Sequence, residues 1–280
     1  MSRIAILWKA LPIFAGALLF CVPSCHKTPA PGKVTPDTDS IPTIQNVRDS
    51  LTVKVKSRGK ILTLDLLVYG GAPLLSLESC HRFTGDSLCI ALKDSLSKTL
   101  VVLGNMPGQI NQAAIQHFDS LQGLEMSLWD DNPQYPFMSG IAEHKGGSAE
   151  LELEIQALMS CVLIRSITNL NDDYTLLENI SFRLSGMNAK AQLMRWSGFS
   201  CSEPVEGQKS PKTFDVGLYT LYPELRLWCY PCDQASATPQ LLVVEYCKQN
   251  AEGDLQVRQV SLETGPIARN SELAMDIYLK

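Results

Sequence analysis

The chain has 280 residues, a net charge of −5 and an ordinary globular composition, with 45% hydrophobic and 19% charged residues. Its basic side chains are scattered, and an acidic protein without a basic stripe is not expected to bind nucleic acid. Once an export signal is removed, the remaining length suits two domains of about 100 to 150 residues each.

Residues 1–24 resemble a lipoprotein signal peptide. Arg3 and Lys9 give a positive start, and residues 10–20 form an uncharged apolar run. This run is shorter than the ~20 residues of a membrane-spanning helix and matches the roughly 7 to 15 of a signal-peptide core. It ends in Val22-Pro23-Ser24-Cys25, which predicts cleavage before Cys25 and its modification by acyl chains such as palmitate. The alternative is an ordinary secretory signal cut near Ser24.

Residues 25–47 are predicted to be the lipidated N-terminus and a proline-containing linker, because they show no hydrophobic periodicity. An alternating pattern starts at Ser50 and predicts a half-buried strand. Further strands are predicted at residues 61–69, 88–92, 99–103, 150–155, 180–184, 217–228, 240–247, 255–262 and 272–279, and one helix at residues 111–122. The pattern indicates an all-β protein with minor helix, with one β-sandwich domain at residues 48–187 and a second at residues 188–280.

Seven cysteines remain after the signal and Cys25 are set aside, so at least one thiol must stay unpaired. Cys80 and Cys89 flank a turn-like segment at residues 83–86 and could form a disulfide across a hairpin. Export would permit such a bond.

Cys229 and Cys232 form a C-x-x-C motif, and Cys247 is the nearest further cysteine. A redox-active pair is expected at the start of a helix, which lowers the thiol pKa, whereas this motif follows a predicted strand. A metal site would need a second pair at similar spacing. A structural disulfide is therefore preferred to a thiol-disulfide redox function.

Other catalytic and metal-binding motifs are absent from the sequence, and no cofactor or small-molecule substrate is predicted. A carbohydrate-binding or adhesin function stays open, because four aromatic residues, Trp129, Tyr135, Trp196 and Trp228, could stack on sugars. Five serines follow an aspartate and precede an aliphatic residue, which resembles the acceptor pattern of Bacteroides-type O-glycosylation: Ser40, Ser50, Ser87, Ser95 and Ser120.

Four blocks of sequence carry a family resemblance: Lys-Thr-Leu-Val-Val-Leu-Gly-Asn-Met-Pro at residues 98–107, Pro-Phe-Met-Ser-Gly at residues 136–140, the alternating run from Glu150, and Pro-Ile-Ala-Arg-Asn at residues 266–270. Together they resemble the fimbrillin superfamily of Bacteroides-type fimbriae. The second block is interpreted as a turn in which Gly140 adopts a backbone conformation closed to other residues.

Shorter lipoproteins of that superfamily are FimB-type anchor and assembly subunits. The resemblance implies two transthyretin-like β-sandwich domains, no cofactor and no enzymatic reaction. It also implies contacts with other fimbrial subunits through β-strands or strand edges, and a lipid-anchored place on the outer membrane, surface-exposed as part of a fimbria.

A stalk or tip pilin is the alternative implied by the same family. Stalk pilins are matured by an arginine-directed protease and polymerise by strand exchange. Arg48 precedes Asp49 and the strand from Ser50, so a cut after Arg48 would release the body from Cys25.

Overall fold

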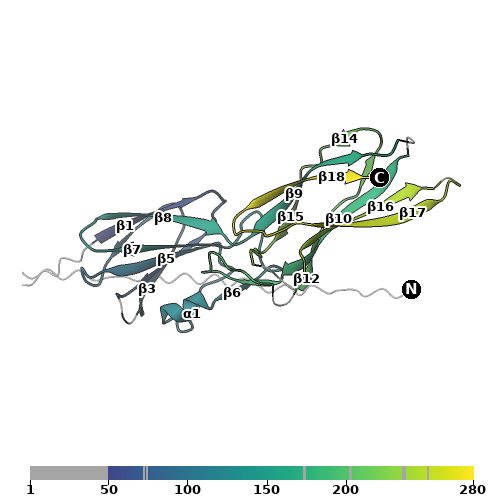
Figure 1. Cartoon of the computed structure of the whole chain (residues 1–280). Helices are drawn as coiled ribbons and strands as arrows, with labels where there is room; N and C mark the ends of the chain where they lie inside the picture. The colour runs from purple at the N-terminus through teal and green to yellow at the C-terminus, as the bar shows by residue number, and fades with distance from the viewer. Residues whose placement is uncertain are drawn as a thin grey trace, which may run out of the picture. The chain divides into compact units, whose positions relative to one another are not determined.

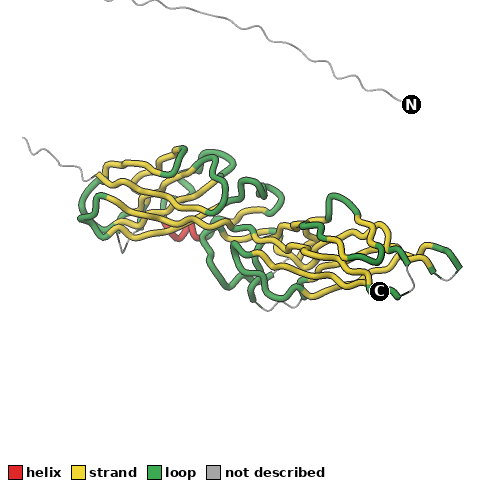
Figure 2. Tube along the Cα trace, turned by 90° about the horizontal axis from the view of Figure 1, so that it is seen from above, coloured by secondary structure: helices red, strands yellow, loops and turns green. Residues whose placement is uncertain are grey.

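The computed structural model describes residues 50–280 except 72, 74, 173, 174, 202, 203, 235–237 and 251. They belong to one compact unit, Val47–Lys280. Strands make up nearly all of its regular structure (Figures 1 and 2), which confirms the all-β prediction. Among the described residues, no helix is long and apolar enough to cross a membrane.

Eight strands and one short helix form the first half. They are β1 (Ser50–Ser57), β2 (Leu64–Tyr69), β3 (Leu77–Phe83), β4 (Ser87–Ala91), β5 (Lys98–Gly104), α1 (Phe118–Gln122), β6 (Glu125–Ser127), β7 (Met138–His144) and β8 (Glu150–Ala157). Seven of the strands pair in the order β3-β2-β5-β7-β8-β1-β4. β7 and β8 share only two residue pairs, and the sheet bends between these two strands. It thereby forms two layers that enclose one apolar core.

β2 and β5 are buried on both faces. Leu66 and Val102 point into the core between the two layers, whereas Leu67 and Val101 contact a second apolar cluster on the opposite face. This second cluster also contains Tyr230 and other residues from the second half of the chain. Burial on both faces explains why β2 and β5 read as continuous apolar runs instead of alternating ones.

The second half is a further sandwich. Its strands are β9 (Ser160–Asn169), β10 (Leu177–Asn188), β11 (Lys190–Gln192), β12 (Pro204–Lys209), β13 (Phe214–Val216), β14 (Thr220–Leu221), β15 (Leu225–Cys229), β16 (Leu241–Gln249), β17 (Leu255–Glu263) and β18 (Glu272–Leu279). One sheet runs β12-β10-β16-β17, and the facing sheet places β9 between β18 and the pair β14 and β15. The core between them holds apolar side chains of both sheets.

Strand pairing differs from the predicted division of the chain. β9 and all but the last residue of β10 lie within residues 48–187, yet both pair with strands of the second half. Each of them pairs with other strands on both of its edges, so β9 and β10 are interior strands of the second sandwich. Two domains therefore remain our proposal, with the boundary moved towards the start of β9.

Three local predictions need correction. The helix predicted at residues 111–122 is limited to α1, since the Asn111 side chain accepts the amide of Ala113 and starts a turn instead. The strand predicted at residues 217–228 is interrupted at Pro223, which separates β14 from β15. Residues 138–140 begin strand β7, so they do not form a turn.

Position 140 requires glycine because there is no room for a side chain, and not because the backbone adopts an unusual conformation. It lies inside β7 and has no positive φ angle. A Cβ there would come within 2.6 Å of Leu153 Cδ2 and would also meet the Glu154 carbonyl oxygen. β8 can therefore approach β7 only where the side chain is missing.

Arg269 joins the two halves. Its side chain is 8% exposed and donates five hydrogen bonds. The acceptors are Gln156 O, Ala157 O and Ser139 Oγ from the first half, and Leu193 O and Arg195 O from the second, at 2.7–3.1 Å. The Trp196 ring covers the guanidinium at 4.1 Å. Burial lowers the pKa of Arg269 to about 10, so the side chain stays charged at neutral pH.

Asp131 is a buried carboxylate in the same region. Its Oδ1 accepts the amide of Phe137 at 2.9 Å, and Oδ2 is a buried atom without a partner among the described residues. Burial raises the pKa of Asp131 to about 6, against the lowering effect of the hydrogen bond from Phe137. The carboxyl group thus takes up a proton more readily in the folded state than in the unfolded chain.

Replacing Arg269 with Met is expected to lower the free energy of unfolding by about 3–5 kcal/mol, because buried acceptors lose their donor. Urea unfolding measures the change. Arg258→Met, at an exposed position of β17, is the control and should stay within about 0.5 kcal/mol of the native protein. A similar loss in both variants would contradict the role of Arg269 as a junction.

Asp131 should make stability fall as pH rises. The unfolded carboxyl titrates near pH 4 and the folded one near pH 6, so the free energy of unfolding drops by about 1–3 kcal/mol across that window and is then constant. Asp131→Asn should reduce this slope to the part that Asp65 contributes, because burial also raises the pKa of Asp65, while Asp130→Asn, at an exposed position, should keep the full slope. Ion-paired carboxylates such as Asp276, with a pKa of about 2, titrate below the window. An unchanged slope in Asp131→Asn would disprove the assignment.

Candidate functional site

Three predicted positions precede the described residues. Cys25, the predicted lipidation site, Ser40, and the predicted processing site Arg48 lie outside them, so their roles stay predictions. β1 is the first described element after these positions. The candidate site is therefore built around β1.

β1 is an interior strand. Residues 52–57 pair in parallel with residues 150–155 of β8, and residues 50–54 pair antiparallel with β4. The inward side chains Leu51, Val53 and Val55 are 0%, 0% and 5% exposed, as the alternating pattern predicted. Burial of three such side chains favours the docked strand by on the order of 5 kcal/mol. β1 is thus held by pairing on both sides and by the core beneath it.

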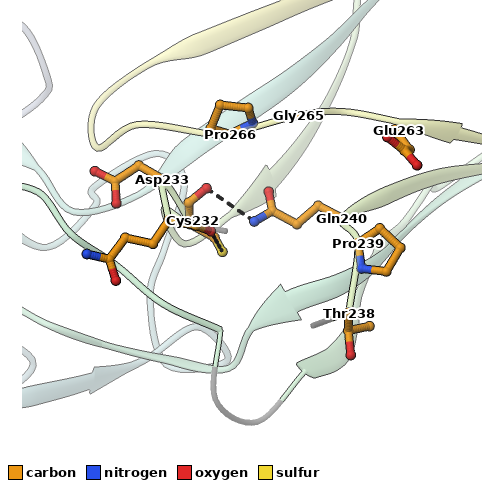
Figure 3. Close-up of a pocket in the computed structure, with 9 residues that line it drawn as sticks. Cys232, Asp233, Thr238, Pro239, Gln240, Glu263, Gly265 and Pro266 are labelled. Atoms are coloured by element: carbon orange, nitrogen blue, oxygen red, sulfur yellow. Dashed lines mark hydrogen bonds between the residues drawn. The ribbon is translucent and has the colours of Figure 1, made fainter. Parts of the chain in front are cut away.

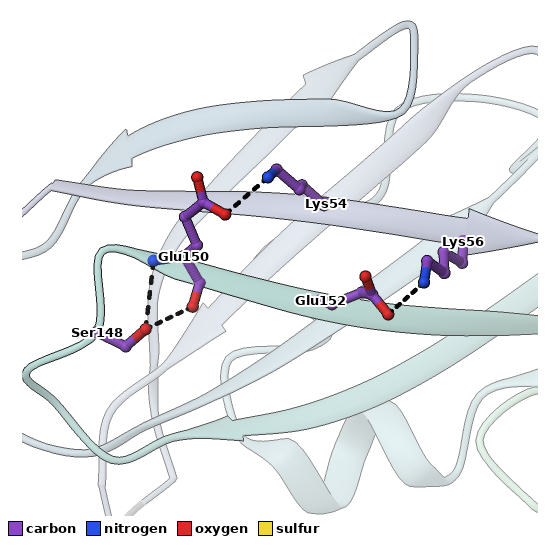
Figure 4. Close-up of polar contacts among 5 residues, drawn as sticks. All are labelled: Lys54, Lys56, Ser148, Glu150 and Glu152. Carbon is purple, nitrogen blue, oxygen red and sulfur yellow. Dashed lines mark hydrogen bonds and ion pairs between the residues drawn. The ribbon is translucent and has the colours of Figure 1, made fainter.

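The outer face of β1 carries positive charge opposite a row of glutamates on β8 (Figure 4). Lys54 Nζ lies 2.7 Å from Glu150, and Lys56 Nζ lies 2.6 Å from Glu152. The hydrogen bond and charge of Glu150 raise the pKa of Lys54. Exposed ion pairs add little stability, but these two match opposite charges across the parallel register of β1 and β8.

A short exposed segment follows β1. Gly59 N donates to Ser57 Oγ at 3.0 Å, which turns the chain out of the sheet, and Arg58 between them is exposed. Arg58 also lines a cleft of about 520 Å³ that is bordered by Trp228 and Glu272 of the second half. The peptide bond after Arg58 therefore lies in an exposed segment outside the described strands.

The five cysteines predicted to form disulfides all carry free thiols in the structure: Cys80, Cys89, Cys229, Cys232 and Cys247. The hairpin assumed for Cys80 and Cys89 is wrong, because β3 pairs with β2 and β4 pairs with β1. These two cysteines therefore lie on strands that are not neighbours. Disulfide formation among the five stays a prediction.

Cys229 and Cys232 are close together and buried. Cys229 ends β15, and Cys232 forms an isolated bridge with Ile267. Burial raises the pKa of Cys229 to about 12 and also raises that of Cys232. A redox-active C-x-x-C motif needs the opposite shift, so the surroundings of this pair do not favour thiolate chemistry.

Cys232 borders a cavity of about 320 Å³ (Figure 3). Gln240 Nε2 donates to the Cys232 carbonyl oxygen at 3.2 Å, and the nearby Asp233 carboxylate accepts the amides of Gly198 and Phe199. Asp233 is thus engaged in holding a loop. Among the described residues, no three His, Cys, Asp or Glu side chains are grouped to hold a metal ion.

The predicted glycosylation serines in the described part of the chain are exposed. Ser50 begins β1, Ser87 begins β4, Ser95 lies in the loop after β4, and Ser120 lies in α1. Exposure is compatible with modification and does not test it.

The four aromatic residues proposed for sugar stacking have different surroundings. Trp129 is 63% exposed, whereas Trp196 covers Arg269 and Trp228 packs against an apolar cluster. Tyr135 forms an isolated bridge with Asn132. Packing accounts for Trp196 and Trp228, so only Trp129 presents most of its ring to solvent.

Sequence reasoning singled out the blocks containing Ser139 and Arg269 but missed that they meet. Arg269 Nη2 donates to Ser139 Oγ at 2.9 Å, and Ser139 Oγ donates to Leu193 O at 2.6 Å. The contact spans 130 residues, and neither periodicity nor spacing could indicate it. The two blocks have a structural role at the junction between the halves.

Thiol reactivity distinguishes these sites. Cys89, which is exposed, should be alkylated by iodoacetamide at about pH 8, while Cys161 and Cys229, each with a pKa of about 12, should be protected in the folded protein. Peptide mapping by mass spectrometry measures each rate, and urea-unfolded protein is the control in which all three react. Labelling of Cys229 as fast as Cys89 would revive the redox function.

Comparison with known proteins finds solved structures with a similar fold. No protein-family model matches the chain, and no curated protein matches it in sequence. A proposed cell adhesion protein from Parabacteroides distasonis matches with a TM-score of 0.64 and 12% identity, over 82% of this chain and 88% of that one. A fimbrilin from Porphyromonas gingivalis matches with a TM-score of 0.56 and 12% identity, over 83% of this chain and 99% of that one. A fimbrial assembly protein from Parabacteroides distasonis matches with a TM-score of 0.52 and 8% identity, over 81% of this chain and 90% of that one. The chain therefore has the β-sandwich fold of these fimbrial and adhesion proteins, as the resemblance implied.

Proposed function

We propose that the chain is a non-enzymatic fimbrial anchor and assembly subunit, tethered to the outer membrane by acyl chains on Cys25 and joined to its body by residues 25–47. The fold shared with a fimbrilin and a fimbrial assembly protein supports a fimbrial role. Several acyl chains would anchor it stably, whereas one would bind only marginally.

The observation that carries this proposal is the position of β1. Arg48 precedes β1, so a cut there would leave residues 50–57 paired with both β4 and β8. No groove would open for the strand of a neighbouring subunit. A body that retains its first strand suits a subunit that stays joined to Cys25, with other subunits contacting its strand edges.

A stalk or tip pilin is the second candidate, and one observation favours it. Arg58 is exposed directly after β1, and a cut there would detach β1 together with everything before it. The gap between β4 and β8 could then accept the strand of a neighbouring subunit, because both flanking strands would expose unpaired backbone groups.

The O-glycosylation of Ser40, Ser50, Ser87, Ser95 and Ser120 is a separate proposal. An intact mass of the exported chain that contains no glycan would rule it out.

The N-terminus of the protein on cells tests the anchor proposal. Mass analysis of the chain purified from the outer membrane should find acylated Cys25 joined to an uncut body, and Cys25→Ser should move the protein out of the membrane fraction. Ser24→Ala is the control and should leave it there. A mature protein that begins at Asp49 or Gly59 would contradict the anchor role, and Gly59 would establish the pilin alternative.

A further inference from the structure

β17 differs from the other edge strands that the structure describes. It is nine residues long and pairs with β16 at every position without a register shift, and no described strand lies on its other side (Figure 1). Its outer edge thus presents backbone donors and acceptors over about 30 Å. Such an edge is a template for pairing with another chain.

Natural sheets protect their edges by short strands, bulges, prolines or charges. β4 has five residues, β12 begins with Pro204 and contains two register shifts, and the ladders of β3 and β18 each contain one shift. β17 contains neither proline nor bulge, and its charged residues are Arg258 and Glu263 alone. The sequence leaves this edge open.

Apolar side chains accompany the open edge. Val257 is 78% exposed, the largest value among the exposed large hydrophobic residues described, and Leu255 on the same face is 55% exposed. Val260 and Leu262, on the opposite face, pack against the core. Leu255 and Val257 thus point away from the core, opposite Gln249 and Cys247 of β16, and stay largely exposed.

We propose that β17 is a dimer interface, in which the β17 edge of a second copy pairs antiparallel with it around a twofold axis at Gln259. All nine residues then pair, and each side chain meets one on the same face of the continuous sheet. Val257 faces Ser261, Arg258 faces Val260 and Leu255 faces Glu263, so no two charged side chains lie directly opposite each other.

The pattern of charges favours a second copy as the occupant, because in this register the charged side chains of each copy face uncharged residues of the other. Nine residues from each copy are fewer than the roughly 20–30 a side of a standard interface, so the dimer is expected to be weak and reversible. A differently charged partner is not indicated, because the edge carries one positive and one negative side chain. Dimerisation does not depend on the anchor role.

Sedimentation velocity tests this with the full exported chain, carrying Cys25→Ser so that no lipid is attached. From ~1 to 200 µM the native chain should convert from monomer to dimer. Val257→Lys, which places a charge on the edge, should raise Kd about tenfold or more. Leu96→Lys is the matched control, since Leu96 is 66% exposed in the loop after β4, and it should dimerise like the native chain.

Cross-linking tests the register. In a Cys89→Ser background, Gln259→Cys should form a disulfide-linked dimer on mild oxidation, because the two copies of residue 259 face each other about 5 Å apart. Gln256→Cys should not, because its copies are separated by six residues, or ~20 Å. A chain that stays monomeric, a Val257→Lys variant that dimerises normally, or equal cross-linking at both positions would overturn the proposal.

Discussion

The arrangement of the two halves depends on Arg269, whose five hydrogen bonds join acceptors from both of them. A charged guanidinium that is 8% exposed has no carboxylate partner among the described residues, so main-chain carbonyls and the Ser139 hydroxyl must replace its water shell. Such a side chain tolerates burial only while all its acceptors stay in place. Because the acceptors come from β7, β8 and residues 193–195, their positions are fixed relative to β18, which follows Arg269 directly.

How far the sequence predicts the fold depends on burial. β18 was predicted to the residue, since Leu273, Met275, Ile277 and Leu279 alternate with polar positions and face the core. β2 and β5 were recognised as strands although they lack alternation, because both their faces are covered. Strand β3, in contrast, has mixed and half-buried side chains and gives no clear pattern. Because no pattern predicts β3, the predicted hairpin between Cys80 and Cys89 is wrong.

The sequence blocks behind the family resemblance were located correctly, but their physical roles were not. Asn105 has a φ of +60° and its amide joins three loops, accepting from Leu62 N and donating to the carbonyls of Lys60 and Pro136. Gly140 allows β8 to approach β7. Each role depends on atoms 13 to 45 residues away, so local propensity contains no information about it. Residue type and position could be predicted from sequence, whereas the contacts could not.

β1 connects the fold to the proposed role. It pairs in parallel with β8, which follows it by about a hundred residues, and a parallel pair needs a long crossover connection. Its core contacts are complete, with Leu51 and Val53 fully buried. The chain thus fixes its first strand by one ladder to β4 and by a second to β8, which is far away in sequence. A pull on the N-terminus would act directly on this strand, where two ladders and the core resist it together. That placement suits a body held by its N-terminal end.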